Sequence, residues 1–188
     1  AASCAFALDC GSPTRPALPD SSSPPFFPSE GASLHYRLDL PQGSGPFPAV
    51  VVGHGSGRTT LDEGSIHVPF LTGAGFAVLR YDKRGVGLST GVYRGLSAQN
   101  SETQVAELAA DMSAGVAFLK TRPEIDSRRI GLVGVSQSGW PMAAAARQST
   151  DVRFMIAING STLPVGTNIY YEGLPTSASL DANYASLA

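Results

Sequence analysis

The stretch RIGLVGVSQSGW, residues 129–140, joins an apolar run to a turn that carries two serines. The run 129–134 is typical of a strand buried on both faces of a parallel sheet, and the segment 137–148 is predicted to be a helix. A nucleophilic serine in such a fold stands on the sharp turn between strand and helix, with its hydroxyl directed away from the sheet. Ser136 is at that turn, in the third position of the pattern G-x-S-x-G, while Ser138 is expected to lie already in the helix.

The stretch departs from that pattern at its fifth position, where Ser138 replaces the second glycine. Glycine at this position lets the helix pass close to a neighbouring strand, and serine is among the smallest side chains that can replace it. We therefore expect the substitution Ser138→Gly to be tolerated, because it would relieve crowding. Taken alone, the turn is equally compatible with Ser136 as a nucleophile and with Ser136 as a helix N-cap.

Strands and helices alternate through the chain on both sides of this stretch. Apolar residues recur at helical spacing over 101–122, where Ser101 is expected to be the N-cap. The other predicted elements are strands at 32–40, 49–53, 75–82 and 152–160 and a less regular helix at 62–72. This alternation predicts an α/β fold with a mostly parallel central sheet and helices on both faces.

The length and composition fit one folded domain. The chain has 188 residues, of which 43% are hydrophobic and 15% charged, as in globular proteins. We expect the folded domain at 29–188, with the start of a lid after residue 161. The segment 1–28 is expected to be a Pro/Ser-rich tail or a processed export segment, because its AASC is similar to a bacterial lipoprotein cleavage box. This favours a location outside the cytoplasm, with the cytoplasm as the alternative, and leaves open whether Cys4 and Cys10 are paired.

The charge balance excludes several classes of partner. A formal net charge of −2 gives no basic surface for nucleic acid or an anionic membrane. No apolar run approaches the roughly 20 residues that span a bilayer. No cluster of His or Cys has the spacing of metal ligands, so neither a metal nor a cofactor is expected. A small molecule is the expected partner, and the oligomeric state is not predicted.

Four loops follow the carboxyl ends of the predicted strands, where ligands collect in α/β sheets. They are HGSGRTT (54–60), DKRGVGLSTG (82–91), SQSGW (136–140) and NGSTLPVG (159–166). In the first of them, the backbone N–H of Ser56 can face the turn at Ser136, where the N–H of Gln137 is a second donor. Two such donors form an oxyanion hole. His54 is expected to form a local hydrogen bond that shapes the loop rather than to act as a base.

Three motifs in this order and spacing resemble the α/β-hydrolase superfamily, and most of all its esterase-type members. They are HGSG (54–57), RYDKRGVGLSTG (80–91) and IGLVGVSQSG (130–139), and the resemblance covers about residues 29–165. It implies that Ser136 is the nucleophile and that Ser56 and Gln137 provide the oxyanion hole. The supporting residues that it implies are His54, Gly55, Asp82, Arg84, Gly85 and Gly134, of which Asp82 has a structural role.

The same resemblance predicts a catalytic acid and a histidine after Ser136. No histidine follows Ser136, because the three of the chain are His35, His54 and His67. The acids that follow it include Asp151, Glu172 and Asp181, and Asp151 is expected at the wrong end of a strand. We therefore expect the sequence to lack a C-terminal third with two strands and both residues, so that the fold stops after about six strands and the 188-residue chain alone is inactive.

The favoured interpretation is a serine hydrolase that acts on carboxylic esters through an acyl-enzyme. A second interpretation is a non-catalytic binding module with the same fold. A third is a nucleotide-binding protein that uses GHGSGRTT (53–60), although this loop is too short for the phosphate-loop pattern and has Arg58 where lysine belongs.

Overall fold

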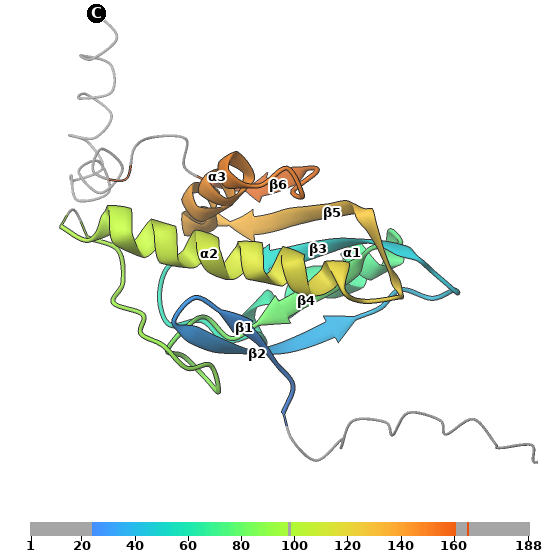
Figure 1. The fold of residues 1–188 in the computed structure, drawn as a ribbon, viewed down its shortest axis with the longest axis horizontal. Coiled ribbons are helices and arrows are strands. Elements are labelled where there is room, and N and C mark those ends of the chain that lie inside the picture. The colour runs from blue at the N-terminus through green and yellow to red at the C-terminus, as the bar shows by residue number, and fades with distance from the viewer. Residues whose placement is uncertain (1–23, 98, 161–164, 166–188) are drawn as a thin grey trace, which may run out of the picture.

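Six strands form a single sheet in the computed structural model, which describes residues 24–97, 99–160 and Val165. The strand order is β1-β2-β4-β3-β5-β6 (Figure 1). The strands are β1 (Phe26–Ser29), β2 (Ala32–Asp39), β3 (Phe47–Gly53), β4 (Ala77–Tyr81), β5 (Ile125–Val135) and β6 (Met155–Ile158). Strands β4, β3, β5 and β6 run parallel, whereas β1 and β2 form an antiparallel edge.

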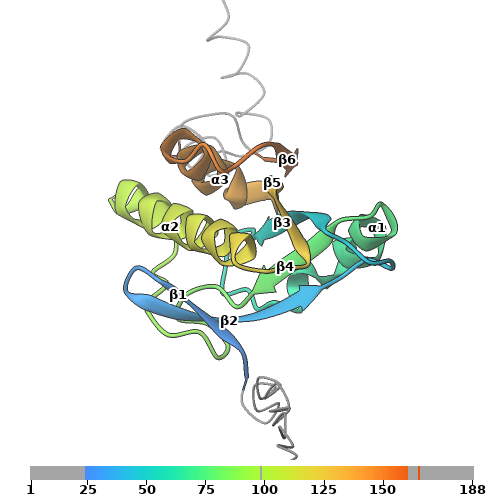
Figure 2. The same ribbon diagram turned by 45° about the vertical axis from the view of Figure 1, so that its right-hand side comes forward.

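Helices cover both faces of this sheet. They are the short 3-10 helix η1 (Glu63–His67), α1 (Val68–Gly73), α2 (Ser101–Lys120), the 3-10 turn η2 (Ser136–Ser138) and α3 (Gly139–Gln148). Helices α2 and α3 pack against each other on one face, and α1 lies on the other, as Figure 2 shows. The predicted α/β fold with a mostly parallel sheet is confirmed.

The core consists of apolar strand residues on the two sides of β3, β4 and β5. Val51 and Leu79 are fully buried and belong to the cluster that α2 covers, whereas Val50 and Val78 belong to the cluster that α1 covers. Burial on both faces explains why these strands are nearly continuous apolar runs. Gly115 brings α2 close to the sheet, because a Cβ there would lie 3.0 Å from a methyl group of Val51.

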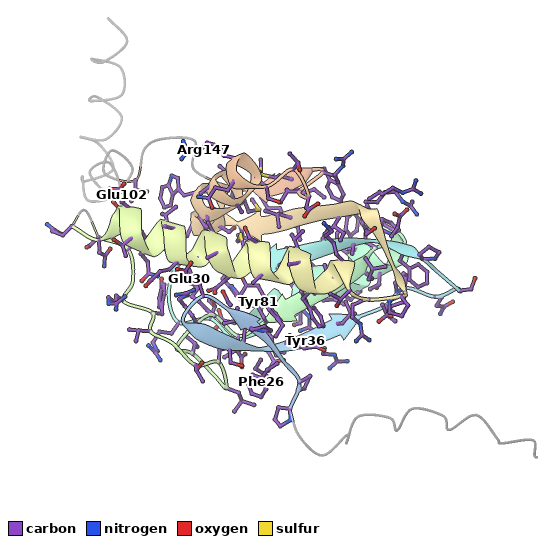
Figure 3. All side chains as sticks on the ribbon, viewed as in Figure 1. Phe26, Glu30, Tyr36, Tyr81, Glu102 and Arg147 are labelled. Atoms are coloured by element: carbon purple, nitrogen blue, oxygen red, sulfur yellow. The ribbon has the colours of Figure 1, made fainter. Side chains whose placement is uncertain are left out.

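The antiparallel edge starts earlier than predicted. Strand β1 begins at Phe26, whereas the sequence placed the first folded residue near 29. Phe27 is 1% exposed, and its ring stacks on that of Phe118 of α2 at 5.5 Å between centroids. Tyr36 and Tyr81, labelled in Figure 3, are register partners on β2 and β4 and lie next to this cluster. Tertiary packing therefore recruits residues whose Pro-rich surroundings predict a tether.

Two local predictions are wrong. Ser101 does not cap α2, because the N-cap is Asn100, whose side chain instead bonds the N–H of Ser97 and the C=O of Gly95. Ser138 lies in the 3-10 turn rather than in the following helix. Cys4, Cys10 and the predicted lid after residue 161 lie outside the described residues. None of the helices in the described part has the length and apolar character needed to cross a membrane.

Candidate active site

Ser136 stands on a strained turn at the carboxyl end of β5. Its φ is 53°, and the other non-glycine residue with positive φ in the described part of the chain is Asn159. A left-handed serine costs about 1–3 kcal/mol and persists only where the surrounding structure holds it. The N-cap of the 3-10 turn is Val135, and no side-chain cap is formed there. Ser136 therefore occupies the sharp strand-to-helix turn predicted for it and does not cap the helix.

Two glycines on neighbouring strands make room for the turn. Gly53 of β3 and Gly134 of β5 are register partners, and a Cβ on either one would lie within 2.8 Å of the Cβ of Ser138. Ser138 is fully buried and donates a hydrogen bond of 2.7 Å to the C=O of Val135. The side chain of Ser138 fills this notch and forms a bond that glycine would lose, which the expectation of relieved crowding did not include.

The loop after β3 lies against the turn. A Cβ on Gly55 would be 4.0 Å from the Cβ of Ser136. His54 Nε2 donates a 2.6 Å hydrogen bond to the C=O of Tyr81, and the described residues show no hydrogen bond between His54 and Ser136. Burial and the charge of Lys83 lower the pKa of His54 to about 4, so the ring is neutral at pH 7. This hydrogen bond connects the loop after β3 to β4, 27 positions later in the chain.

A cavity of about 350 Å³ opens between this loop and the turn. Ser56 and Ser136 line it from the two sides, and Glu63 and His67 line it from η1. The backbone N–H of Ser56 has no acceptor among the described residues, whereas the N–H of Gly57 donates to the hydroxyl of Tyr93 at 3.3 Å.

The loop after β4 carries three consecutive buried charges that point in different directions. The carboxylate of Asp82 accepts bonds of 2.9 Å from the N–H groups of Leu61 and Leu88 and one of 2.8 Å from Nδ1 of His35. Burial alone would raise the pKa of Asp82, but these bonds outweigh it and lower that pKa. The carboxylate of Asp82 thus fixes the path of the loop.

Arg84 connects the same loop to α2 and to the turn after β1. Its guanidinium donates two hydrogen bonds of 2.8 Å to the carboxylate of Asp111 and one of 3.1 Å to the C=O of Glu30. The hydroxyl of Ser29 donates to Asp111 as well. Burial would lower the pKa of Arg84, but the bonds with Asp111 raise it. Gly85 has φ of +66°, and a Cβ there would lie 2.8 Å from the N of Tyr93, so the turn requires glycine.

Lys83 points toward the loop after β3 and the side chain of Gln137. Its Nζ donates 2.7 Å hydrogen bonds to the C=O groups of Gly55 and Gly57, lies 3.5 Å from Oε1 of Gln137, and sits 4.2 Å above the ring of Tyr93. The hydroxyl of Tyr93 also donates to Oε1 of Gln137 at 3.3 Å. Sequence reasoning did not identify Lys83 or Tyr93, since a charged or aromatic residue in a glycine-rich loop gives no sign of burial.

The predicted base and acid are not found in the described part of the chain. None of its histidines hydrogen-bonds Ser136. Asp151 precedes β6, at the end of the sheet away from Ser136, and forms a surface ion pair of 2.7 Å with Lys120. Glu172 and Asp181 lie outside the described residues. Those residues also contain no group of three or more His, Cys, Asp or Glu that could hold a metal ion.

Sequence comparisons connect the chain to hydrolases. Residues 30–187 match the family described as X-Pro dipeptidyl-peptidase (S15 family). The uncharacterized protein PA2218 of Pseudomonas aeruginosa is 27% identical over 159 residues, which cover 84% of this chain and 40% of that protein. Acyl-coenzyme A thioesterase 1 of Mus musculus is 32% identical over 145 residues, or 77% of this chain and 31% of the mouse protein. The chain therefore spans less than half the length of these relatives.

Structural comparisons agree on the fold. The crystal structure of PA2218 has a TM-score of 0.65 at 20% identity and covers 87% of this chain and 50% of that one. The α/β hydrolase GrgF from Penicillium sp. sh18 has a TM-score of 0.61 at 25% identity and covers 73% of this chain and 45% of its own.

Proposed function

The chain belongs to the X-Pro dipeptidyl-peptidase (S15) family within the α/β-hydrolase superfamily, and from this membership we propose that it is a serine hydrolase of carboxylic esters with Ser136 as its nucleophile. The relatives support hydrolysis of an acyl group, because a thioesterase and a peptidase family both transfer an acyl group to water. An ester is the form of this chemistry that we propose here.

The observation that carries the proposal is the left-handed conformation of Ser136 beside the loop at Gly55. In this reaction Oγ of Ser136 attacks the carbonyl carbon of the ester, and the alcohol leaves with a proton. Water then attacks the acyl-enzyme and releases the acid. A general base must take the proton of Ser136, and we expect a histidine in this role.

The oxygen that becomes negative needs two donors near Ser136. We assign these to the N–H of Gln137 and the N–H of Ser56. Gln137 belongs to the first turn of a helix, where backbone N–H groups have no intrahelical acceptor and the helix dipole favours negative charge. The N–H of Ser56 lies in the loop that lines the cavity with Ser136 and has no acceptor in the described part.

The contacts of the GHGSGRTT loop favour this function over nucleotide binding. The guanidinium of Arg58 donates a 2.6 Å hydrogen bond to the C=O of Gly85. The C=O groups of Gly55 and Gly57 face Lys83. The one basic side chain of the loop is therefore engaged with the protein itself rather than held ready for a phosphate.

The test is labelling of the protein as its gene encodes it with a fluorophosphonate probe, together with hydrolysis of p-nitrophenyl acetate. We expect labelling and turnover in the wild type and in Ser138→Ala, the neighbouring control, and neither in Ser136→Ala. Labelling that persists in Ser136→Ala and disappears in Ser138→Ala would contradict the assignment. A folded wild type without labelling or turnover would instead support the non-catalytic binding module.

A further inference from the structure

We propose that Lys83 is a positioning residue of the oxyanion hole, which it orients and polarises through the peptide group between Gly55 and Ser56 and through the side chain of Gln137. This inference rests on the function proposed above, in which the N–H groups of Ser56 and Gln137 receive the negative oxygen. Lys83 itself touches neither the substrate nor Ser136.

The burial of Lys83 differs from that of the other buried basic residues. Three basic side chains of the described residues are buried, and two of them have a carboxylate partner: Arg80 pairs with Asp39, and Arg84 pairs with Asp111. Lys83 is 0% exposed and has no carboxylate within salt-bridge distance in that part of the chain. A buried ammonium with only dipoles around it is unfavourable for stability. Stability therefore does not explain why Lys83 is buried here, whereas a role in the candidate site would.

The peptide group between Gly55 and Ser56 has a fixed geometry. The C=O of Gly55 and the N–H of Ser56 belong to one planar trans unit, in which they point in opposite directions. Lys83 Nζ lies 2.7 Å from the oxygen of Gly55, on the buried side. The N–H of Ser56 is therefore directed away from the ammonium, toward the cavity side of the loop. A cation bound to the oxygen also strengthens the N–H as a donor, since hydrogen bonds in a chain polarise one another.

The same ammonium also reaches the side chain of Gln137, the residue of the second proposed donor. Oε1 of Gln137 lies 3.5 Å from Nζ of Lys83 and accepts a bond from the hydroxyl of Tyr93. The side chain of Gln137 thus connects the start of the helix to Lys83 and Tyr93 of the loop after β4. One positive charge lies behind both proposed donors, in a buried region where it stabilises a developing negative charge more strongly than it would in water.

Titration of Lys83 gives a second readout. Burial lowers the pKa of Lys83 to about 8, and the charge of Glu63 partly opposes this effect. The other titratable groups around it are the neutral His54 after β3, the adjacent Asp82, and Tyr93 in its own loop. Lys83 is thus protonated at pH 7 and neutral above about pH 9. We expect kcat to fall as the pH rises through about 8.

The experiment compares Lys83→Met with Lys120→Met, a control in a surface ion pair with Asp151, in the protein as its gene encodes it. Two quantities are measured: the kinetics of p-nitrophenyl acetate hydrolysis, and the inhibition constant of a phenyl trifluoromethyl ketone, which forms a tetrahedral oxyanion on serine. For Lys83→Met we expect kcat to fall on the order of 10- to 100-fold, the inhibition constant to rise by a similar factor, and KM to stay within about threefold. The control should match the wild type.

A purely structural role predicts a different result. Lys83→Met would then lower the melting temperature but leave kcat and the inhibition constant of the folded protein unchanged, and this outcome overturns the inference. If Lys83→Met does not fold, Lys83→Arg decides, because arginine stays charged: loss of the alkaline fall near pH 8 supports the inference, and an unchanged fall overturns it.

If the proposed serine hydrolase function is wrong, the variants of Ser136 and Lys83 will give a different set of results. Turnover that survives Ser136→Ala would overturn the proposed nucleophile and, with it, the role of Lys83. Turnover that depends on Ser136 but not on Lys83 overturns only the present inference.

Discussion

Lys83 and Arg84 are neighbours in one loop and are both buried, but their charges are balanced in different ways. Arg84 pairs with the carboxylate of Asp111 on α2 and also bonds the turn after β1, so that it fastens the loop to both. Lys83 faces carbonyl oxygens, an amide oxygen and an aromatic ring, and it has no carboxylate partner among the described residues. The difference indicates that the paired cation serves the architecture and that the unpaired one serves the candidate site.

The strongest test of this contrast is Arg84→Met. It leaves Asp111 buried without its cation, and we expect a loss of about 3–5 kcal/mol in the free energy of unfolding, measured by urea denaturation. The kcat of the protein that remains folded should not change. Adding Asp111→Leu should restore much of the lost stability, since a buried pair can be replaced by apolar residues. A loss below about 1 kcal/mol would show that Arg84 does not hold the architecture.

The dependence of stability on pH should separate the two cations. The pKa of Lys83 is about 8 in the folded state and near 10.5 in the unfolded state, so between these values the unfolded chain binds more protons. The free energy of unfolding should therefore rise between pH 8 and pH 10.5, by roughly 1–3 kcal/mol. Lys83→Met should lack this rise, and Arg84→Met should keep it. If the free energy of unfolding depends on pH in the same way in Lys83→Met and in the wild type, the rise does not come from the titration of Lys83.

A smaller effect is expected at the turn itself. Ser138→Gly removes the hydrogen bond to Val135 and adds a flexible residue, so we expect a loss of about 1–2 kcal/mol. Ser138→Ala removes only the bond and should lose less. Chemical denaturation measures the two losses of unfolding free energy and shows which is larger. Fluorophosphonate labelling of Ser136 should continue in both variants. A Ser138→Gly protein as stable as the wild type would restore the sequence-based view that the notch is crowded.

The smallest effect should come from Lys120→Met. This lysine forms an ion pair with Asp151 in which both side chains are substantially exposed, and such pairs contribute about 0–1 kcal/mol. We expect a change in unfolding free energy of less than about 0.5 kcal/mol, which gives the baseline for the loss of a lysine. A change as large as that of Arg84→Met would mean that the comparison of buried and exposed charges does not hold.

Sequence alone predicts the parts of this molecule that depend on local pattern. The apolar runs of β3 and β5 and the place of Ser136 follow from residues next to one another in the chain. Strand β1 was missed because its Pro-rich surroundings indicate a tether, whereas contacts with Tyr36 and Phe118 order Phe27.

Lys83 was missed for a related reason. Its partners are the backbone carbonyls of Gly55 and Gly57, 28 and 26 positions earlier in the chain. Every residue has a backbone carbonyl, so a contact with one cannot be predicted from the pattern of side chains. The sequence could therefore predict the position of Ser136 on its turn but not the layer of residues behind it.

The contact between Ser29 and Asp111 also has a consequence for biosynthesis. The two residues are 82 positions apart, and Glu30 is 54 positions from Arg84. Contacts over such separations form late, because closing a long loop costs chain entropy before any bond compensates for it. Strand β1 is synthesised before α2, so the bond from Ser29 can form only after Asp111 has left the ribosome. Until then Phe27 also lacks the ring of Phe118 on which it stacks in the folded chain.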